Sequence, residues 1–394
     1  MDNKIVVIAV VAVIAVAGVA AFFLFFNNGG GDSDEKGLAV IGRVNSEGSG
    51  ILLVPGEDTT DYIAADGTLI ASGWGGKVFA TPGAATIQHV QLMDLASQMN
   101  LKFVSYSEGA QLKDDTLYYM PNVASFADFV NATKTAEDLV GYIIWEAQYS
   151  VGLENGYVGL ALTNDLFPGH TCCIIGTSNK YIVKNKDVLE TFLATYASAV
   201  DKINAALNNP TSADYATLIN IAKNRVSMPD SMTDAQKEAA IKSALENVTY
   251  LYADNSSGSL SKLESDIAKL AEQLYNNTVI EKSPADLGFS SYADLADAFV
   301  KDDCMKEALR ANYVKPTSMT TIKVAAIKGD IHQIALWYAY DTGMFEANNL
   351  DVVVSAQANG PGVYTQLANG ESDIGFLGAP PMTIRCMNGE QIHA

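Results

Sequence analysis

The sequence is poor in basic residues and in cysteines. Lysine and arginine together number 25, against 45 aspartates and glutamates, and the net charge is −20. Because binding to a phosphate backbone requires a basic surface, this balance argues against a nucleic-acid partner. Four cysteines are too few for a disulfide framework in a chain of 394 residues. The sequence also lacks G-x-S-x-G, P-loop and H-E-x-x-H motifs, so nothing in it indicates the enzyme classes that use them.

A long apolar run opens the chain. Residues 5–26 carry no charge, and as a helix they extend over about 33 Å, enough for the hydrocarbon core of a bilayer. A signal peptide has a shorter apolar core, and no cysteine follows the run to suggest a lipid anchor. Lys4 precedes the run and acidic residues follow it, which favours an N-terminus inside the cell. We therefore predict a membrane anchor over 1–26 and a flexible tether over 27–36. The rest is expected at the outer face of the cytoplasmic membrane, with secretion after signal cleavage as the alternative.

The pattern after the tether changes along the chain. Over 37–177, short apolar runs alternate with helical patterns, which indicates an α/β fold with a mostly parallel sheet. The pattern becomes helical over about 186–311. Residues 312–321 combine proline with small polar residues, as is typical of a linker. A fresh series of alternating strands and helices then fills 320–394, and it repeats no earlier part of the chain.

Several stretches resemble a known family. The last segment contains a strand, a Gly-Asp turn, a helix ending near GMFE, then LDVVV, a Gly-Pro-Gly turn, LANGESDIGFLG and APPMTI. This order is similar to the start of the solute-binding proteins that serve ABC importers of nitrate, sulfonates, taurine and thiamine-precursor pyrimidines. The earlier stretches VIGRVNSEGSGILLV, GGKVFATPGAATIQHV, GYIIWEAQYS and FPGHTCCII resemble the later parts of sequences in that family. Together these stretches cover nearly all of the chain after the tether.

The order of the segments differs from that of the family. Family order would run from about residue 320 to 394 and then from 37 to about 315, with nothing missing or repeated. We interpret the chain as a circular permutant, whose original first elements stand at its end and are joined through the linker 312–321. The alternative is a fused or truncated second copy, which should repeat elements found elsewhere.

The resemblance implies a two-lobed, type II periplasmic-binding-protein-like fold. We expect lobe 1 to comprise 37–55 and 320–394, and lobe 2 to comprise 56–165. Residues 166–311 would supply a return strand of the hinge and a helical tail packed on lobe 1. The implied function is an extracellular solute-binding receptor of an ABC importer, without catalysis, cofactor or metal. Its partners would be a small polar ligand, the membrane subunits of the importer and, through the N-terminal helix, the membrane.

The cleft of such a fold needs polar groups from both lobes. Helix N-termini suit oxyanions, because their free N–H groups and the positive end of the helix dipole face the ligand. Turns and strand ends at the implied cleft supply these candidates for ligand contact: Asn45, Glu47, Ser49, Gly83, Ala84, Thr86, His89, Trp145, Glu146, His170, Asp330, His332, Gln333, Gly360, Gly378, Ala379 and Pro380. Asp330 and Gln333 also match a helix capping box. Glu47 and Trp145 are expected to face the open cleft from opposite lobes.

The ligand and the rival functions stay open at this point. The implied cleft mixes helix N-termini with acids and few bases, so an aminosulfonate zwitterion or a neutral aminopyrimidine would fit at least as well as a simple anion. An enzyme resembling the thiamine-pyrimidine synthases would need a cysteine-rich iron site, and Cys172-Cys173 is too short for that; we interpret the pair as packed thiols. A ligand-sensing ectodomain would need a cytoplasmic output module, and about four residues precede the predicted anchor.

Overall fold

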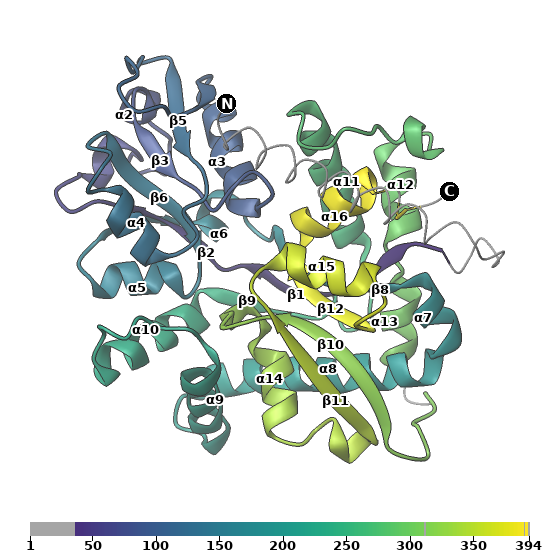
Figure 1. Ribbon diagram of the computed structural model, residues 1–394. Coiled ribbons are helices and arrows are strands. Elements are labelled where there is room, and N and C mark those ends of the chain that lie inside the picture. Colours follow the sequence, from purple (N-terminus) through teal and green to yellow (C-terminus); the bar gives the residue numbers. More distant parts are fainter. Residues whose placement is uncertain (1–35, 311–312, 390, 393–394) are drawn as a thin grey trace, which may run out of the picture.

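A computed structural model describes residues 36–310, 313–389 and 391–392 (Figure 1). These residues form two six-stranded sheets flanked by helices, which confirms the predicted α/β class. The predicted membrane anchor, and the tether except for Lys36, lie outside the described residues. None of the helices in the described part is long and apolar enough to cross a membrane.

Sheet A brings together strands that are far apart in the sequence. Its order is β11–β10–β12–β8–β1–β9, so β1 and the three C-terminal strands belong to one sheet, with β8 between β12 and β1. β10 is parallel to β11 and β12, whereas β8 is antiparallel to both β12 and β1. The sheet is therefore mixed rather than mostly parallel. Its strands are β1 (Leu38–Glu47), β8 (Thr171–Ser178), β9 (Val248–Tyr250), β10 (Thr320–Ile327), β11 (Leu350–Gln357) and β12 (Ile374–Gly378).

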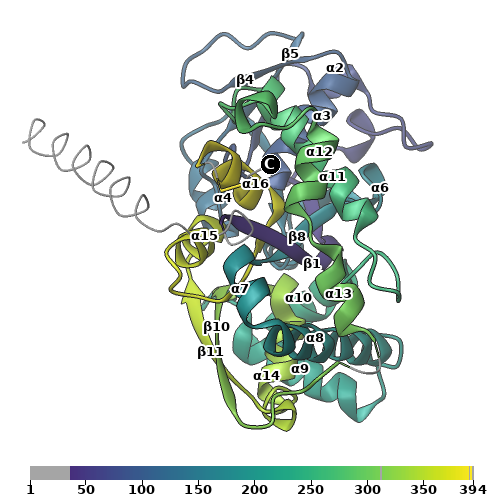
Figure 2. The same ribbon diagram turned by 90° about the vertical axis from the view of Figure 1, so that its right-hand side faces the viewer.

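Sheet B is built from one continuous part of the chain. Its order is β4–β5–β3–β6–β2–β7, with β2 antiparallel to its neighbours β6 and β7 and the remaining pairs parallel. Its strands are β2 (Ser49–Leu53), β3 (Val78–Ala80), β4 (Lys102–Ser105), β5 (Thr116–Met120), β6 (Leu139–Trp145) and β7 (Val158–Leu162). Figure 2 shows the elements of sheet B at one end of the molecule and α8, α9 and α14 at the other, with β1 and β8 between them. We call the two halves the sheet A lobe and the sheet B lobe.

Within residues 36–310 the chain passes between the two sheets at two places. Gly48 separates β1 from β2, and residues 163–170, which include the short helix α6 (Thr163–Leu166), lead from β7 to β8. Gly48 has φ +85°, and a Cβ there would lie 2.5 Å from Nε2 of His332, so glycine is required at this crossing. The predicted first lobe extended to residue 55, whereas β2 pairs in sheet B. The boundary lies at Gly48 because the left-handed turn there redirects the chain.

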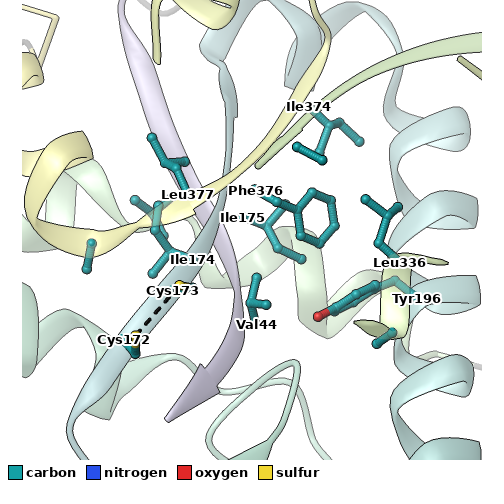
Figure 3. Packing of buried hydrophobic residues seen from close by; sticks show 14 of the residues in the cluster. Val44, Cys172, Cys173, Ile174, Ile175, Tyr196, Leu336, Ile374, Phe376 and Leu377 are labelled. Carbon is teal, nitrogen blue, oxygen red and sulfur yellow. Dashed lines mark hydrogen bonds between the residues drawn. The ribbon is translucent and has the colours of Figure 1, made fainter. Parts of the chain in front are cut away.

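The helices of the sheet A lobe bury one broad apolar core. On α8, apolar residues recur at helical spacing, and in Figure 3 its Tyr196 meets Phe376 and Ile175 of the sheet and Leu336 of α14. The ring centroids of Tyr196 and Phe376 lie 5.3 Å apart, at an angle typical of an edge-to-face pair. The helices are α7 (Asn179–Lys184), α8 (Lys186–Leu207), α9 (Ala213–Arg225), α10 (Asp234–Glu246), α11 (Ser261–Asn276), α12 (Tyr292–Phe299), α13 (Asp302–Ala308), α14 (Ile334–Asp341), α15 (Gly360–Ala368) and α16 (Ala379–Asn388).

The helices of the sheet B lobe are shorter. They are α2 (Ala71–Trp74), α3 (Ile87–Gln98), α4 (Phe126–Ala132) and α5 (Gln148–Glu154). The indole of Trp74 stacks on the ring of Phe79 with centroids 4.7 Å apart. In the described residues the short 3-10 helices are η2 (Thr59–Asp61), η3 (Ala285–Leu287), η4 (Ile331–Gln333) and η5 (Glu346–Asn348).

The helical tail contacts both lobes rather than lobe 1 alone. Ala240 of α10 and Met232 ahead of it are buried in an apolar cluster with Tyr142 and Ile144 of β6 in sheet B. These residues reach the cluster because α10 lies against α5 of the sheet B lobe. The tail therefore bridges the two lobes.

The two ends of the described chain lie side by side. The N–H of Leu38, at the start of β1, donates a hydrogen bond of 2.9 Å to the carbonyl of Gln391. The predicted linker has its described part at 313–319, and β10 begins at Thr320. Gln391, near the end of the described residues, thus lies at the place where sheet A begins.

Candidate functional site

A cavity of about 270 Å³ lies between the two lobes. One wall is α3 of the sheet B lobe, and the opposite wall is α11 of the tail. The loop that crosses to β8 and the start of α16 close its ends. The polar and small residues that line this cleft cavity are Gln91, Asp94, His170, Thr171, Asp266, Lys269, Gln273 and Ala379, and apolar residues such as Val90, Phe167 and Leu270 complete it.

α3 presents a polar stripe to the cavity and to the crossing. The helix begins at Thr86, whose hydroxyl accepts a hydrogen bond from the N–H of His89. Gln88, Gln91 and Asp94 follow at three-residue spacing, so their side chains share a face. Nε2 of Gln88 donates to Oγ of Ser49 at 2.8 Å, which fastens α3 to the first residue of β2. Gln91 and Asp94 are thereby directed toward the other lobe.

His170 is held as a neutral imidazole that accepts from Gln91. Its Nδ1 lies 2.8 Å from the carbonyl of Phe167, so Nδ1 carries the proton and donates it. Nε2 must then accept from Nε2 of Gln91, at 2.9 Å. Burial lowers the pKa of His170, in agreement with the neutral ring. In this arrangement Oε1 of Gln91 has no hydrogen-bond partner among the described residues.

Asp94 joins the two lobes across the cavity. Nε2 of Gln273, on α11, donates to both carboxylate oxygens of Asp94, at 3.1 and 2.9 Å. Burial raises the pKa of Asp94, because the charged form loses water that one amide does not replace. The contact closes the sheet B lobe onto the tail.

The carboxylate of Asp266 already has hydrogen-bond donors from Thr171 and an ion pair with Lys262. One of its oxygens accepts from the N–H of Thr171 at 3.2 Å and from its hydroxyl at 2.7 Å. The ammonium group of Lys262 lies 2.8 Å from the same oxygen. Asp266 therefore holds the start of β8, and its charge is balanced by Lys262.

The starts of α15 and α16 offer few N–H groups. α16 begins at Ala379 and continues with Pro380 and Pro381, which have no N–H to donate. In α15, the N–H of Gly362 already donates to the Asn359 side chain at 3.0 Å, and the preceding residue is a proline. Gly360 is packed rather than open, because a Cβ there would lie 2.9 Å from Cγ of Pro381. An oxyanion would find fewer backbone donors here than the sequence interpretation assumed.

Several predicted site residues gather at the Gly48 crossing instead. His332 is 2% exposed, with Nδ1 2.7 Å from the carboxylate of Asp330 and Nε2 2.9 Å from the carbonyl of Gly48. Both ring nitrogens face acceptors, so both carry protons and the ring is an imidazolium. Burial lowers the pKa of His332, but the charge and hydrogen bond of Asp330 outweigh burial and raise that pKa to about 10. His332 thus clamps the crossing.

Glu146 lies on the other side of the crossing and is 1% exposed. Its carboxylate accepts from the N–H and hydroxyl of Ser150, at 3.1 and 3.0 Å, and from Nδ2 of Asn247 at 2.7 Å. Burial raises the pKa of Glu146, and these donors oppose that rise. Because Ser150 is on α5 and Asn247 follows α10, Glu146 ties the sheet B lobe to the tail.

Glu47 and Trp145 do not line the cavity. The oxygens of Glu47 accept from the N–H of Gly169 at 2.7 Å and from the hydroxyl of Thr249 at 3.0 Å, so its side chain holds the crossing loop. Trp145 is partly buried and packs against the apolar cluster of sheet B. Both side chains thus have partners away from the cleft cavity, and ligand contact by them stays a prediction.

The other predicted residues have local partners. His89 lies 3.1 Å from the Thr81 hydroxyl and contacts the stacked rings of Phe103 and Tyr119, and burial lowers its pKa to about 4. Gln333 accepts from the N–H of Ile327 and donates to Asp330 and to the carbonyl of Phe376. From the predicted set, His170 and Ala379 line the cleft cavity. The residues placed elsewhere are Asn45, Glu47, Ser49, Gly83, Ala84, Thr86, His89, Trp145, Glu146, Asp330, His332, Gln333, Gly360, Gly378 and Pro380.

Sequence reasoning missed the polar residues of α3 and α11. Gln91 and Asp94 continue the three-residue spacing that begins at Gln88, and that polar spacing was the available signal. Asp266, Lys269 and Gln273 lie on the polar face of an amphipathic helix, where surface residues and site residues look the same. Nothing in their spacing distinguishes the part of that face that meets α3.

Cys172 and Cys173 lie at the end of the crossing, in β8. The pairing of β8 with β1 is irregular here, and the two Sγ atoms lie 3.7 Å apart (Figure 3). The thiol of Cys173 and, more weakly, the charge of His332 lower the pKa of Cys172 to about 7. Both cysteines are buried and free. No cluster of His, Cys, Asp and Glu suited to a metal ion occurs in the part of the chain that the structure describes.

Comparisons with known proteins give distant similarities in structure. No protein-family model and no curated protein matches the sequence. One similar structure is a zinc-bound ligand-binding component of an ABC-type import system from Staphylococcus aureus, with a TM-score of 0.45 and 14% identity over 69% of this chain and 75% of that chain. Another is the periplasmic nitrate-binding protein NrtA from Synechocystis PCC 6803, with a TM-score of 0.39 and 12% identity over 70% of this chain and 68% of that chain.

Proposed function

We propose that the protein is a solute-binding receptor that encloses a small polar molecule between its lobes and presents it to an ABC importer. The observation that carries the proposal is the cleft cavity itself. It lies between two α/β lobes connected at two crossings, and polar side chains enter it from both sides. Its volume of about 270 Å³ is near the lower end of the roughly 300–1,000 Å³ of small-molecule sites, so the ligand is small.

Capture would work by closing the lobes. Rotation about Gly48 and residues 163–170 would bring α3 against α11, forming the contact between Asp94 and Gln273. Opening would break that contact and expose the cavity to water. Such a cycle requires no bond to be made or broken in the ligand, so the role is binding rather than catalysis.

The same proposal includes the protein family, the permuted order of the chain segments and the location of the protein. The sequence stretches described above favour the nitrate, sulfonate and taurine family in circularly permuted order. The hydrogen bond between Leu38 and Gln391 supports the permutation, because it places the two ends where a direct connection could join them. The predicted anchor over 1–26 would hold the receptor at the outer face of the cytoplasmic membrane, beside the importer's membrane subunits.

The proposal is tested by looking for the enclosed molecule. Full-length protein should release one small molecule per chain on denaturation, identified by mass spectrometry, and adding it back should compact the ligand-free protein in small-angle scattering. Added ligand at a hundred times its Kd should stabilise the fold by about 2.7 kcal/mol. Ile87→Trp, which fills the cavity, should abolish both effects.

Two results would contradict the receptor proposal or its placement of the site. If the purified protein holds no small molecule and no candidate solute alters its melting temperature or its compactness, the receptor proposal is wrong. If a molecule binds equally well to the Ile87→Trp variant, the protein binds a ligand, but the cleft cavity is not where it binds.

A further inference from the structure

We infer that the cleft cavity takes a small molecule with a protonated amine and an apolar body, rather than a simple oxyanion. This inference rests on the proposed function, because it names the ligand class of the same cavity. It depends on which hydrogen-bond donors and acceptors the two walls leave available.

The α3 wall leaves acceptors available. Gln91 is 3% exposed, and its amide orientation is determined by His170, which can only accept from it. Oε1 of Gln91 is therefore an acceptor without a partner in the described part of the chain. One turn further along, Asp94 receives a single amide group, from Gln273, although a carboxylate can accept about four hydrogen bonds. A ligand placed beside Gln91 and Asp94 must donate.

Positive charge is scarce at the same place. His170 is neutral because its Nδ1–H donates to the carbonyl of Phe167 while its Nε2 faces the NH₂ group of Gln91, and burial lowers the pKa of the ring. Lys262 is paired with Asp266, and Lys269 is exposed at the rim. Pro380 and Pro381 remove two of the backbone donors that a helix start would offer an anion. An oxyanion beside Asp94 would face that carboxylate, whereas Lys269, the cation of the lining, is exposed to solvent.

The remaining lining is apolar. Ile87 and Val90 of α3, Phe167 of the crossing loop and Leu270 of α11 supply it. These side chains suit the carbon skeleton of the ligand, with its ammonium group against Asp94 and Gln91. An alkylamine or a short diamine has this combination of groups.

Calorimetry on the full chain with matched probes tests the inference. Butylamine and 1,4-diaminobutane are the ammonium probes, and butanesulfonate and nitrate are the anionic ones. We expect the amines to bind and the anions not to bind. Asp94→Asn keeps an acceptor for Gln273 but removes the charge, and it should weaken amine binding at least about ten-fold, equivalent to about 1.4 kcal/mol.

Asp115→Asn is the matched control. Asp115 is an exposed carboxylate paired with Lys102 in the sheet B lobe, so its loss changes the net charge equally and should leave amine binding unchanged. Thermal melting without ligand verifies that both variants are folded.

The outcomes separate this inference from the receptor proposal. Failure of both amines to bind, or equal weakening by the two variants, overturns the amine inference. If an anion binds instead, more tightly to Asp94→Asn than to the natural protein and not to Ile87→Trp, the receptor proposal stands while the ligand class is wrong. If no probe binds and no molecule co-purifies, both are wrong.

Discussion

At the scale of single residues, the Gly48 crossing is controlled by one charged ring. The His332 imidazolium donates to Asp330 and to the Gly48 carbonyl. The charge of Cys172 helps to raise the pKa of His332, and the charge of His332 opposes the rise that burial causes in the pKa of Glu146. Its pKa of about 10 lies above the ordinary value of 6.5. The stabilisation from this ring is therefore fully present below pH 6.5 and is lost as the pH rises through about 10.

This gives a pH-dependent prediction. We expect the difference in unfolding free energy between the natural protein and His332→Gln to shrink steadily from pH 6.5 to about 10, measured by urea titration at a series of pH values. His89→Gln is the control. Because burial lowers the pKa of His89 to about 4, its difference should stay constant over the same range. Parallel stability curves for the natural protein and His332→Gln would contradict the prediction.

Gly48 supplies a second prediction. An alanine there must hold φ near +85°, and its Cβ would meet His332 at 2.5 Å. The left-handed conformation alone costs about 1–2 kcal/mol, and displacing a buried clamp adds to it. We expect Gly48→Ala to lower the unfolding free energy by at least about 2 kcal/mol. Gly67→Ala, also at positive φ but with open space around it, should lose only the conformational part.

Residue by residue, the sequence predicted the crossing better than the cavity. Small-residue turns after strands led to Gly48's neighbours and to Ala379, because turn chemistry is local. Gln91 and Asp94 could be identified only once α11 was placed opposite α3, and that depends on how distant segments pack. The sequence predicted Asp330 and His332 as ligand contacts, whereas in the structure their side chains hydrogen-bond to each other.

At the scale of elements, Glu146 is the tie between α5 and the end of α10. Replacing it with glutamine turns one oxygen into an NH₂ group that faces donors from Ser150 and Asn247. We expect Glu146→Gln to destabilise the fold by about 1–3 kcal/mol, because a buried donor is left unpaired. Urea titration measures this. Glu154→Gln, at the exposed end of α5, should change stability by less than about 0.5 kcal/mol, and equal effects would refute the role of Glu146 as a tie.

Most helices and strands could be predicted from the sequence, but their boundaries could not. Alternating apolar runs indicated most strands, because period and turn residues are local signals. β9 was missed because Val248–Tyr250 is three residues long and stands among helical patterns. The first lobe was extended to residue 55 although the polar stretch 45–50 separates the apolar residues of β1 from those of β2. The turn at Gly48, where the chain leaves sheet A, lies within that stretch.

At the scale of the whole molecule, the contact between Leu38 and Gln391 permits a rearranged chain. We expect a protein in which residues 313–394 precede residues 36–310 to fold to the same structure, because residue 394 then continues directly into sheet A. Its melting temperature, ligand binding and small-angle scattering should match those of the same residues in their natural order. An aggregated or expanded product would contradict both this expectation and the proposed permutation.

The strand order of sheet A also determines when each sheet can be completed during synthesis. Sheet B is complete once residue 162 has emerged, whereas β8 must wait for β12, which ends at Gly378, before its second edge is covered. At 5–20 residues per second, the stretch from Ser178 to Gly378 takes about 10–40 s to make. Throughout that time the nascent chain carries a complete sheet B beside a strand with an open edge, the kind of surface on which chains associate wrongly. Because β10, β11 and β12 all follow residue 319, the completion of sheet A, rather than of sheet B, is the late step on which the fold depends.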